Sequence, residues 1–157
     1  MRLMKKLTIL FMILAPAMAT QARIVRAWSY QELYDQSDLI VIAKYISSER
    51  TAEQWVLPNI SPNTDVVGLS SNFSVFLVLK GDQSLKSLVL HHYQLKTPVS
   101  ADIPVINGPM LASFDSDKLA KQFLLFLRRE SDGRYAPVSG QTDPRDTSIF
   151  RLAGPNQ

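Results

Sequence analysis

The sequence predicts a small, mainly β protein in which five or six strands close into a barrel, with a β-sandwich as the alternative and with one short N-terminal helix. Apolar stretches rich in β-branched and aromatic residues recur along the chain between turn-forming residues. One helix-start signature precedes them. Long connections follow the first strand, and a barrel removes the exposed edges that such apolar strands otherwise present.

Residues 1–19 have the three-part layout of a secretory signal: a basic start, the apolar run 7–14 and a closing Ala-Met-Ala. The apolar run is far shorter than the roughly 20 residues that span a bilayer. We expect cleavage after Ala19, with cleavage after Ala22 as the second choice. Residues 20–157 are then expected to form a single β-barrel domain without a membrane span, secreted or periplasmic.

The charge of the chain is balanced once this signal is removed. There are 17 Lys and Arg residues against 14 Asp and Glu, and three of the basic residues lie within the signal. A chain with no net charge and no long basic run lacks the electrostatic footprint of a nucleic-acid-binding protein. The sequence has no cysteine. Because small secreted animal domains usually carry disulfides, this composition favours a bacterial periplasmic or secreted protein.

The only helix expected in the domain lies near its start. Ser29 and Glu32 have the spacing of a capping box, with Ser29 as N-cap and Glu32 at the third helical position. We expect the helix to run from Tyr30 to about Gln36. Leu33 and Tyr34 are the side chains expected to pack against the body of the domain.

The clearest strand is Leu39–Ile46, which is apolar on both faces at its start, as in a strand buried on two sides. Thr51–Asn72 contains two prolines, a glycine and several Asn and Ser residues, so we expect a long connection with one irregular strand near 55–57. The further strands are expected at Phe73–Lys80, Leu85–Leu95, Lys121–Arg129, Arg134–Val138 and Thr147–Leu152. Ser131-Asp132-Gly133 is expected to form the tight turn that leads into the strand at Arg134–Val138.

The order of these segments resembles that of the netrin-like module found in tissue inhibitors of metalloproteinases. Ser37–Lys44 matches the family's opening of a small residue, an acid, an apolar run, a small residue and a lysine. Leu79–Gly81 matches its apolar-lysine-glycine strand end, and Lys121–Leu124 its lysine-aromatic-leucine strand. The likeness spans residues 37–140. It implies a five-stranded OB-like barrel and a protein-binding module.

The chain departs from this family at the residue that carries the family's activity. Those inhibitors chelate the protease zinc with the amino group and carbonyl of an N-terminal cysteine, which disulfides hold in place. This chain has no cysteine. The resemblance therefore implies a fold class and a role in protein binding, but neither metalloprotease inhibition nor any functional residue.

His91 and His92 are the pair that most suggests metal or acid–base chemistry. Adjacent residues on a strand point to opposite faces, so the two imidazoles do not share one metal ion. His92 shares a face with Leu88 and Leu90, and His91 shares the other with Tyr93. A zinc site would also need further ligands, and the sequence has no third histidine. We expect no metal at this pair.

The connections Thr51–Asn72 and Lys96–Asp117 are the expected binding surface, because loops of OB-type barrels are where partners bind. Trp55 lies in the first connection and is of the type that anchors partners or stacks on sugars. Trp28 is expected to cover an end of the barrel. Asp115 begins a segment expected to form one helical turn, where capping is its simplest role.

The candidate binding residues are Trp28, Trp55, His91, His92 and Asp115. No nucleophile elbow or metal-ligand spacing occurs in the sequence, and we expect no cofactor. The first hypothesis is an exported, non-enzymatic module that binds a protein or a surface polymer through its long loops. The second is a small hydrolase that uses Asp115 with His92, and the third is a structural component of the cell envelope.

Overall fold

The computed structural model describes residues 23–57, 64–97, 108–114 and 122–152. Within them the chain forms six strands and one short helix, which confirms the predicted mainly β fold. The signal expected at residues 1–19 and the helical turn expected at 115–119 lie outside the described residues. The elements are α2 (Tyr30–Gln36), β1 (Leu39–Leu57), β2 (Thr64–Lys80), β3 (Ser87–Leu95), β4 (Gln122–Arg129), β5 (Tyr135–Pro137) and β6 (Ile149–Leu152).

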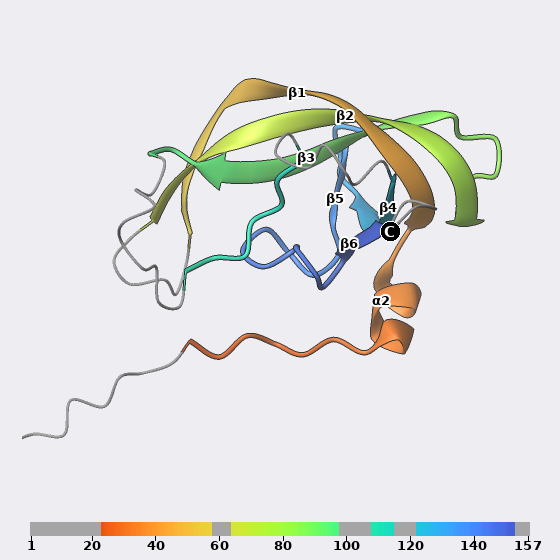
Figure 1. Ribbon diagram of the computed structural model, residues 1–157, viewed down its shortest axis with the longest axis horizontal. Helices are drawn as coiled ribbons and strands as arrows, with labels where there is room; N and C mark the ends of the chain where they lie inside the picture. The colour runs from red at the N-terminus through yellow and green to blue at the C-terminus, as the bar shows by residue number, and fades with distance from the viewer. Residues whose placement is uncertain (1–22, 58–63, 98–107, 115–121, 153–157) are drawn as a thin grey trace, which may run out of the picture.

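Five of the strands form a ring of hydrogen bonds in the order β1-β2-β3-β5-β4, which the pairing of β1 with β4 closes. The pairing of β3 with β5 is parallel and the other pairings in the ring are antiparallel. β6 adds to β4 outside the ring. Figure 1 shows β1 and β2 arching together over the remaining strands. The sheet is therefore barrel-like, and the β-sandwich alternative does not describe it.

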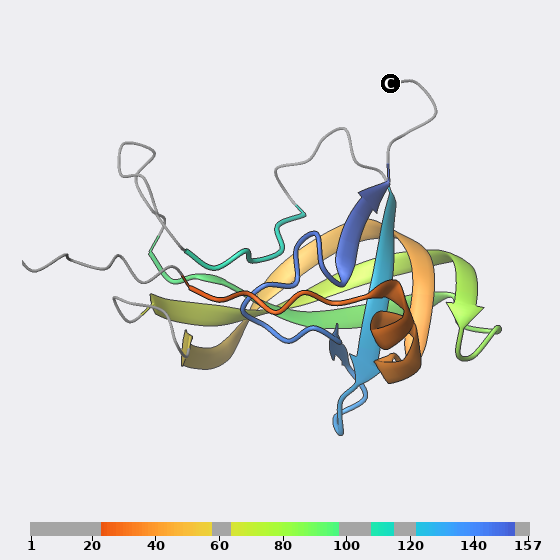
Figure 2. The ribbon, with the colours of Figure 1, turned by 90° about the horizontal axis from the view of Figure 1, so that it is seen from below.

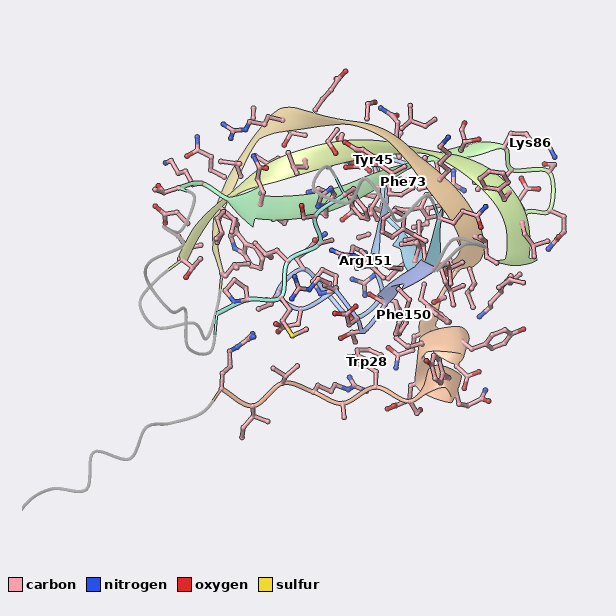
Figure 3. All side chains as sticks on the ribbon, viewed as in Figure 1. Trp28, Tyr45, Phe73, Lys86, Phe150 and Arg151 are labelled. Atoms are coloured by element: carbon pink, nitrogen blue, oxygen red, sulfur yellow. The ribbon has the colours of Figure 1, made fainter. Side chains whose placement is uncertain are left out.

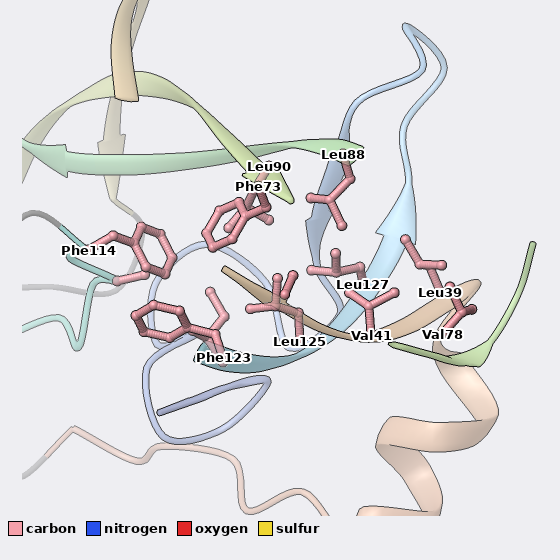
Figure 4. Packing of buried hydrophobic residues seen from close by; sticks show 13 residues of the cluster. Leu39, Val41, Phe73, Val78, Leu88, Leu90, Phe114, Phe123, Leu125 and Leu127 are labelled. Atoms are coloured by element: carbon pink, nitrogen blue, oxygen red, sulfur yellow. The ribbon is translucent and has the colours of Figure 1, made fainter. Parts of the chain in front are cut away.

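The core fills the interior of the ring. Side chains of β1 and β4 point alternately into the ring and out of it. Val41, Leu125 and Leu127 are among those that point inward, and all three are fully buried. Three aromatic rings complete one end of the core: Phe114 lies edge-on to Phe73 and Phe123, at centroid distances of 5.0 Å (Figure 4). Such edge-to-face pairs contribute beyond the area that they bury.

Bulges in the β1–β2 pair bend this part of the sheet. Phe76 and Leu79 of β2, and Ile46 of β1, have no partner across the pair, and each is an extra residue in its strand. Extra residues increase the local bend and twist of a strand, which helps the ring to close. All three side chains are exposed, so the bulges also place apolar groups on the surface.

The structure contradicts the long connection expected at Thr51–Asn72. β1 continues to Leu57 and β2 begins at Thr64, so apart from residues 58–63, which are not described, this stretch is strand. Of the Asn and Ser residues that suggested a loop, Ser70, Ser71 and Asn72 lie on β2 and pair with β1, where Ser71 is buried and the other two are half-buried. The expected binding loop is for the most part a β-hairpin.

The predicted capping box is present in α2: the Ser29 hydroxyl accepts from the Glu32 amide, and the Glu32 carboxylate accepts from the Ser29 amide. Leu33 is buried, as expected. Tyr34 is 47% exposed, which corrects the expectation that it packs inward. Its neighbour Leu33 already occupies the buried side of this seven-residue helix, and the Tyr34 ring lies instead 4.8 Å from Lys80 Nζ.

The segment before α2 runs along the stretch between β5 and β6 (Figure 2). Arg23 fastens it with two hydrogen bonds of 2.6 Å to the Asp143 carboxylate and a third, of 2.9 Å, to the Gly108 carbonyl. Trp28 packs against the cluster that contains Leu33 and lies near Phe150 (Figure 3). Trp28 thus covers the side of β1 and β4 where α2 packs.

Candidate binding site

A hollow of about 430 Å³ lies on the face of β3 that points away from the core. We call it the His91 hollow. Its lining comes from three parts of the chain: the end of β1, the end of β3, and the segments that follow β4 and β5. The lining residues are Glu53, Gln54, Trp55, His91, Tyr93, Glu130 and Gln141.

Strand alternation places His91 and Tyr93 in this hollow. Leu90 and His92 are fully buried on the core side of β3. His91 and Tyr93 take the opposite side, as the two-residue period of a strand requires. The structure therefore separates the two histidines in the way that the sequence predicts.

The glycine opposite Tyr93 makes room for the second wall of the hollow. Gly68 of β2 pairs with Tyr93 of β3 on one side. On its other side β1 bulges: residues 51–53 all lie opposite Gly68, between the pairs Arg50–Leu69 and Gln54–Val67. A Cβ atom on Gly68 would lie 2.7 Å from Glu53 Oε2 and closer still to the Thr51 hydroxyl. Any side chain at position 68 would displace Thr51 and Glu53, so the glycine leaves the room in which Glu53 lies over β2 toward His91.

Two carboxylates face the His91 ring. Nδ1 lies 2.8 Å from Glu130 Oε2, in a hydrogen bond. Nε2 lies 2.9 Å from Glu53 Oε2, but the alignment is not that of a hydrogen bond, and Nε2 has no hydrogen-bond partner among the described residues. The His91 side chain is only 9% exposed. The ring is thus packed between two acidic groups, one from β1 and one from the turn that follows β4.

Arg134 neutralises part of this acidity. Its Nη2 donates to Glu53 Oε1 at 2.8 Å and its Nε donates to Asp132 Oδ2 at 2.7 Å. The hydrogen bond from Arg134, with smaller contributions from Thr51 and His91, lowers the pKa of Glu53 despite its partial burial. The Arg134 backbone amide and side chain likewise lower the pKa of Asp132, and Glu53 raises the pKa of Arg134. All three groups are therefore charged at neutral pH.

The turn that holds Arg134 in place is the one expected from Ser131-Asp132-Gly133. Gly133 has φ of 89°, in the left-handed region that glycine adopts without strain. The Arg134 amide donates to Asp132 Oδ1, and the Glu130 amide donates to the Arg134 carbonyl. These bonds fix the backbone of Glu130 and Arg134, whose charged side chains reach toward β3 and β1.

Aromatic rings form the rim of the His91 hollow. Trp55 is 43% exposed, and its ring centroid lies 5.7 Å from that of Tyr93 at an interplanar angle of 47°. Burial, and then the charges of Glu53 and Glu130, raise the pKa of Tyr93, so its phenol is uncharged at neutral pH.

Gln141 completes the lining of the hollow. It donates its amide N–H to the His91 carbonyl at 2.9 Å, which joins the segment after β5 to β3.

A second hollow, of about 570 Å³, borders the same turn. Ser87 and Val89 line it on β3, and Arg129, Asp132 and Arg134 line it from the β4–β5 hairpin. Arg134 connects the two hollows: it lines the second one, and it pairs with Glu53, which lines the His91 hollow.

His92 belongs to a different environment. Its Nε2 lies 2.7 Å from the Ser71 hydroxyl, which in turn lies 2.5 Å from the Ser48 hydroxyl. Its ring stands edge-on to Phe114 at 5.1 Å. Ser71 and His92 are 0% and 1% exposed. We call these three residues the Ser48–Ser71–His92 chain. It ends in the core and does not reach either hollow.

The structure therefore brings together two of the five candidate residues, Trp55 and His91. Trp28 lines a separate hollow of about 110 Å³ beside the segment after β5, and His92 is in the core. Asp115 lies outside the described residues. The residues that sequence reasoning missed are Glu53, Tyr93, Glu130, Arg134 and Gln141.

Within the described part of the chain, His91 contacts carboxylates and no serine or threonine hydroxyl. No group of three or more His, Cys, Asp or Glu side chains there is arranged to hold a metal ion. No helix among the same residues is long and apolar enough to cross a membrane. Comparison of the chain with protein-family models, with curated proteins and with solved structures found no match.

Proposed function

We propose that this protein is an exported, non-enzymatic binding module that engages a protein or a surface polymer through the exposed side of β3. The single observation that supports this most is the His91 hollow itself. It is lined by half-exposed aromatic rings beside ordered polar side chains, and several elements hold these in place. Concave surfaces with this mixture are typical of binding sites.

The proposal moves the binding surface from the loops to the sheet. The stretch expected to be a binding loop is largely strand, yet it contributes Glu53 and Trp55 to the hollow. In OB-type barrels the exposed face of the second and third strands, flanked by the connections between strands 1 and 2 and strands 4 and 5, is a common binding surface. The netrin-like resemblance and the expected export signal support a protein partner outside the cytoplasm.

The hydrolase hypothesis gains no support from the described residues. His92 was its proposed base, but the ring lies in the core against Phe114 and contacts a hydroxyl that is itself fully buried. A general base must lie within hydrogen-bond reach of the substrate. The structure holds His92 away from any surface where a substrate would bind.

The proposal is tested by affinity capture with immobilised residues 20–157 against the envelope and secreted fractions of the source cells. Bound proteins are identified by mass spectrometry. The Trp55→Ala variant removes an aromatic ring from the rim of the hollow, and Phe76→Ala removes a more exposed aromatic ring that does not line the hollow. We expect a partner in near-equal amount that Trp55→Ala loses and Phe76→Ala keeps. Capture of nothing above the background of an empty matrix would contradict a stable protein complex.

A further inference from the structure

The hydrogen-bonding groups of the His91 hollow are mainly acceptors. Glu53 and Glu130 contribute carboxylate oxygens, and Gln141 contributes its amide oxygen. The Gln141 amide group has a fixed orientation, because its Nε2 donates to the His91 carbonyl. Its Oε1 is then left buried without a hydrogen-bond partner among the described residues. A buried acceptor of this kind is costly unless a donor reaches it.

His91 adds a buried ring that stands between the two carboxylates. Its Nε2 lies 2.9 Å from Glu53 Oε2 and its Nδ1 lies 2.8 Å from Glu130 Oε2. The His91 side chain is more than nine-tenths buried, and it lines the hollow. The open acceptor of Gln141, beside the carboxylates of Glu53 and Glu130, thus points to a ligand with several N–H donors.

The charge of the hollow favours a cation. Besides His91, the charged side chains that line it are the two carboxylates Glu53 and Glu130, and no Lys or Arg is among its lining residues. Arg134 pairs with Glu53 from outside the lining, and Glu130 contacts only the His91 ring among the charged groups of the described residues. Glu53 stays ionised because Arg134 lowers its pKa, and Tyr93 stays uncharged because its pKa is raised. Partial burial weakens the screening of these carboxylates by salt, and they disfavour an anionic ligand such as a nucleic acid.

The aromatic rim favours a planar cation. The Trp55 ring is 43% exposed and is tilted by 47° to Tyr93, which leaves part of the indole available for stacking. Arginine stacks on indole rings and pairs with carboxylates at two points, whereas lysine offers a compact and strongly hydrated charge.

The protein already uses this chemistry within its own chain. The Arg26 guanidinium lies 3.9 Å from the centroid of the Trp28 ring and pairs with Glu32. Arg134 bridges Glu53 and Asp132. We propose that the His91 hollow binds an arginine side chain of a partner polypeptide, with the guanidinium stacked on Trp55 and donating to Glu130 and to Gln141 Oε1. This inference rests on the proposed function, because it names the group that the binding module recognises.

The test is a titration of the isotope-labelled chain with a capped Gly-Gly-Arg-Gly-Gly peptide, observed by NMR at the tryptophan indole N–H groups. The chain has two tryptophans, so Trp28 serves as the internal reference for Trp55. The matched peptide carries citrulline, which has the shape of arginine without its charge. We expect the Trp55 signal to shift and to saturate with the arginine peptide, the Trp28 signal to stay in place, and the citrulline peptide to bind at least roughly tenfold more weakly.

Two variants keep the outcome interpretable. Glu130→Gln removes the carboxylate that we assign to the guanidinium and is expected to weaken binding roughly tenfold. Glu49→Gln removes an exposed carboxylate of β1 outside the hollow and is expected to leave binding unchanged. The dispersion of the amide spectrum shows that each variant is folded. Equal binding of the citrulline peptide, or no change at Trp55, would overturn the inference.

The two proposals fail in different ways. If affinity capture finds a partner that Trp55→Ala loses, while the arginine peptide leaves the Trp55 signal unchanged, the binding module stands and the arginine assignment is wrong. If capture finds no partner and the peptide does not bind, both are wrong. A capped Gly-Gly-Lys-Gly-Gly peptide serves as a third ligand, and its binding as tightly as the arginine peptide would overturn the preference for a planar cation.

Discussion

His91 and His92 are neighbours in the chain and occupy opposite environments. His92 joins two hydroxyl groups and an aromatic edge in the core, where water does not reach. His91 joins two carboxylates beside a hollow on the surface. One strand therefore carries a structural histidine and a candidate functional histidine side by side, and what separates them is the two-residue period of the strand rather than their residue type.

The largest expected effect comes from the inner histidine. His92→Ala should leave a cavity among Phe114 and its neighbours and remove one of the two partners of the buried Ser71 hydroxyl, lowering the free energy of unfolding by about 3 kcal/mol. His91→Ala should lower it by about 1 kcal/mol or less, because the charged groups that it leaves are partly solvated. Urea unfolding of both variants measures the difference. Equal losses would show that the two environments are not energetically distinct.

The second prediction concerns the residue that builds the outer environment. Gly68→Ala should displace Thr51 and Glu53, with a loss of about 1–2 kcal/mol in the free energy of unfolding. The Trp55 indole signal should move while the Trp28 signal does not, since only the bulge in β1 is displaced. Thermal unfolding and the two indole signals report these outcomes. An unchanged Trp55 signal would mean that the bulge does not depend on the missing Cβ.

The third prediction tests the outer end of the Ser48–Ser71–His92 chain. Ser48→Ala removes one partner of Ser71 but leaves the bond between Ser71 and His92. We expect a loss of about 1 kcal/mol in the free energy of unfolding, smaller than that of His92→Ala. Ser47→Ala, which removes a neighbouring hydroxyl that accepts a longer bond of 3.3 Å from Asn72, is the matched control. A loss as large for the control would contradict the importance of the chain.

The smallest expected effect is the acid sensitivity of the outer environment. Because the pKa of Glu53 is lowered in the folded protein, its charge stabilises the fold above about pH 4.5, and this contribution is lost as the pH falls through the lower folded value. The side chain is 40% exposed, so the contribution is less than about 1 kcal/mol. Stability curves of the protein and of Glu53→Gln should converge in acid and separate at neutral pH. Parallel curves would show that the pair with Arg134 contributes nothing.

Local sequence signals predict much of the fold. The capping box of α2, the turn at Ser131–Gly133 and the apolar runs of β1 and β4 depend on neighbouring residues and appear where they are expected. The ends of β1 and β2 escaped prediction because their polar residues pair across a long hairpin, and a sequence pattern does not show which strand lies opposite.

The candidate site was predictable only in part. The alternation of β3 separates His91 from His92, and the exposure of Trp55 follows from its polar surroundings. Glu53 reaches His91 only because Gly68 leaves room, and Glu130 reaches it from a turn 39 residues away. Single residues such as these carry no local pattern. Contacts between segments that are far apart in the sequence can be assigned only once the pairing of the strands is known.

The bond between Arg23 and Asp143 sets a limit on how far the N-terminus of the chain tolerates trimming. Both expected signal-peptidase sites, after Ala19 and after Ala22, precede Arg23, so either product retains its anchor. An aminopeptidase that removes one residue more than the second site would release the stretch before α2 from the segment that follows β5. One guanidinium group thus separates N-terminal trimming that the fold tolerates from trimming that loosens this stretch.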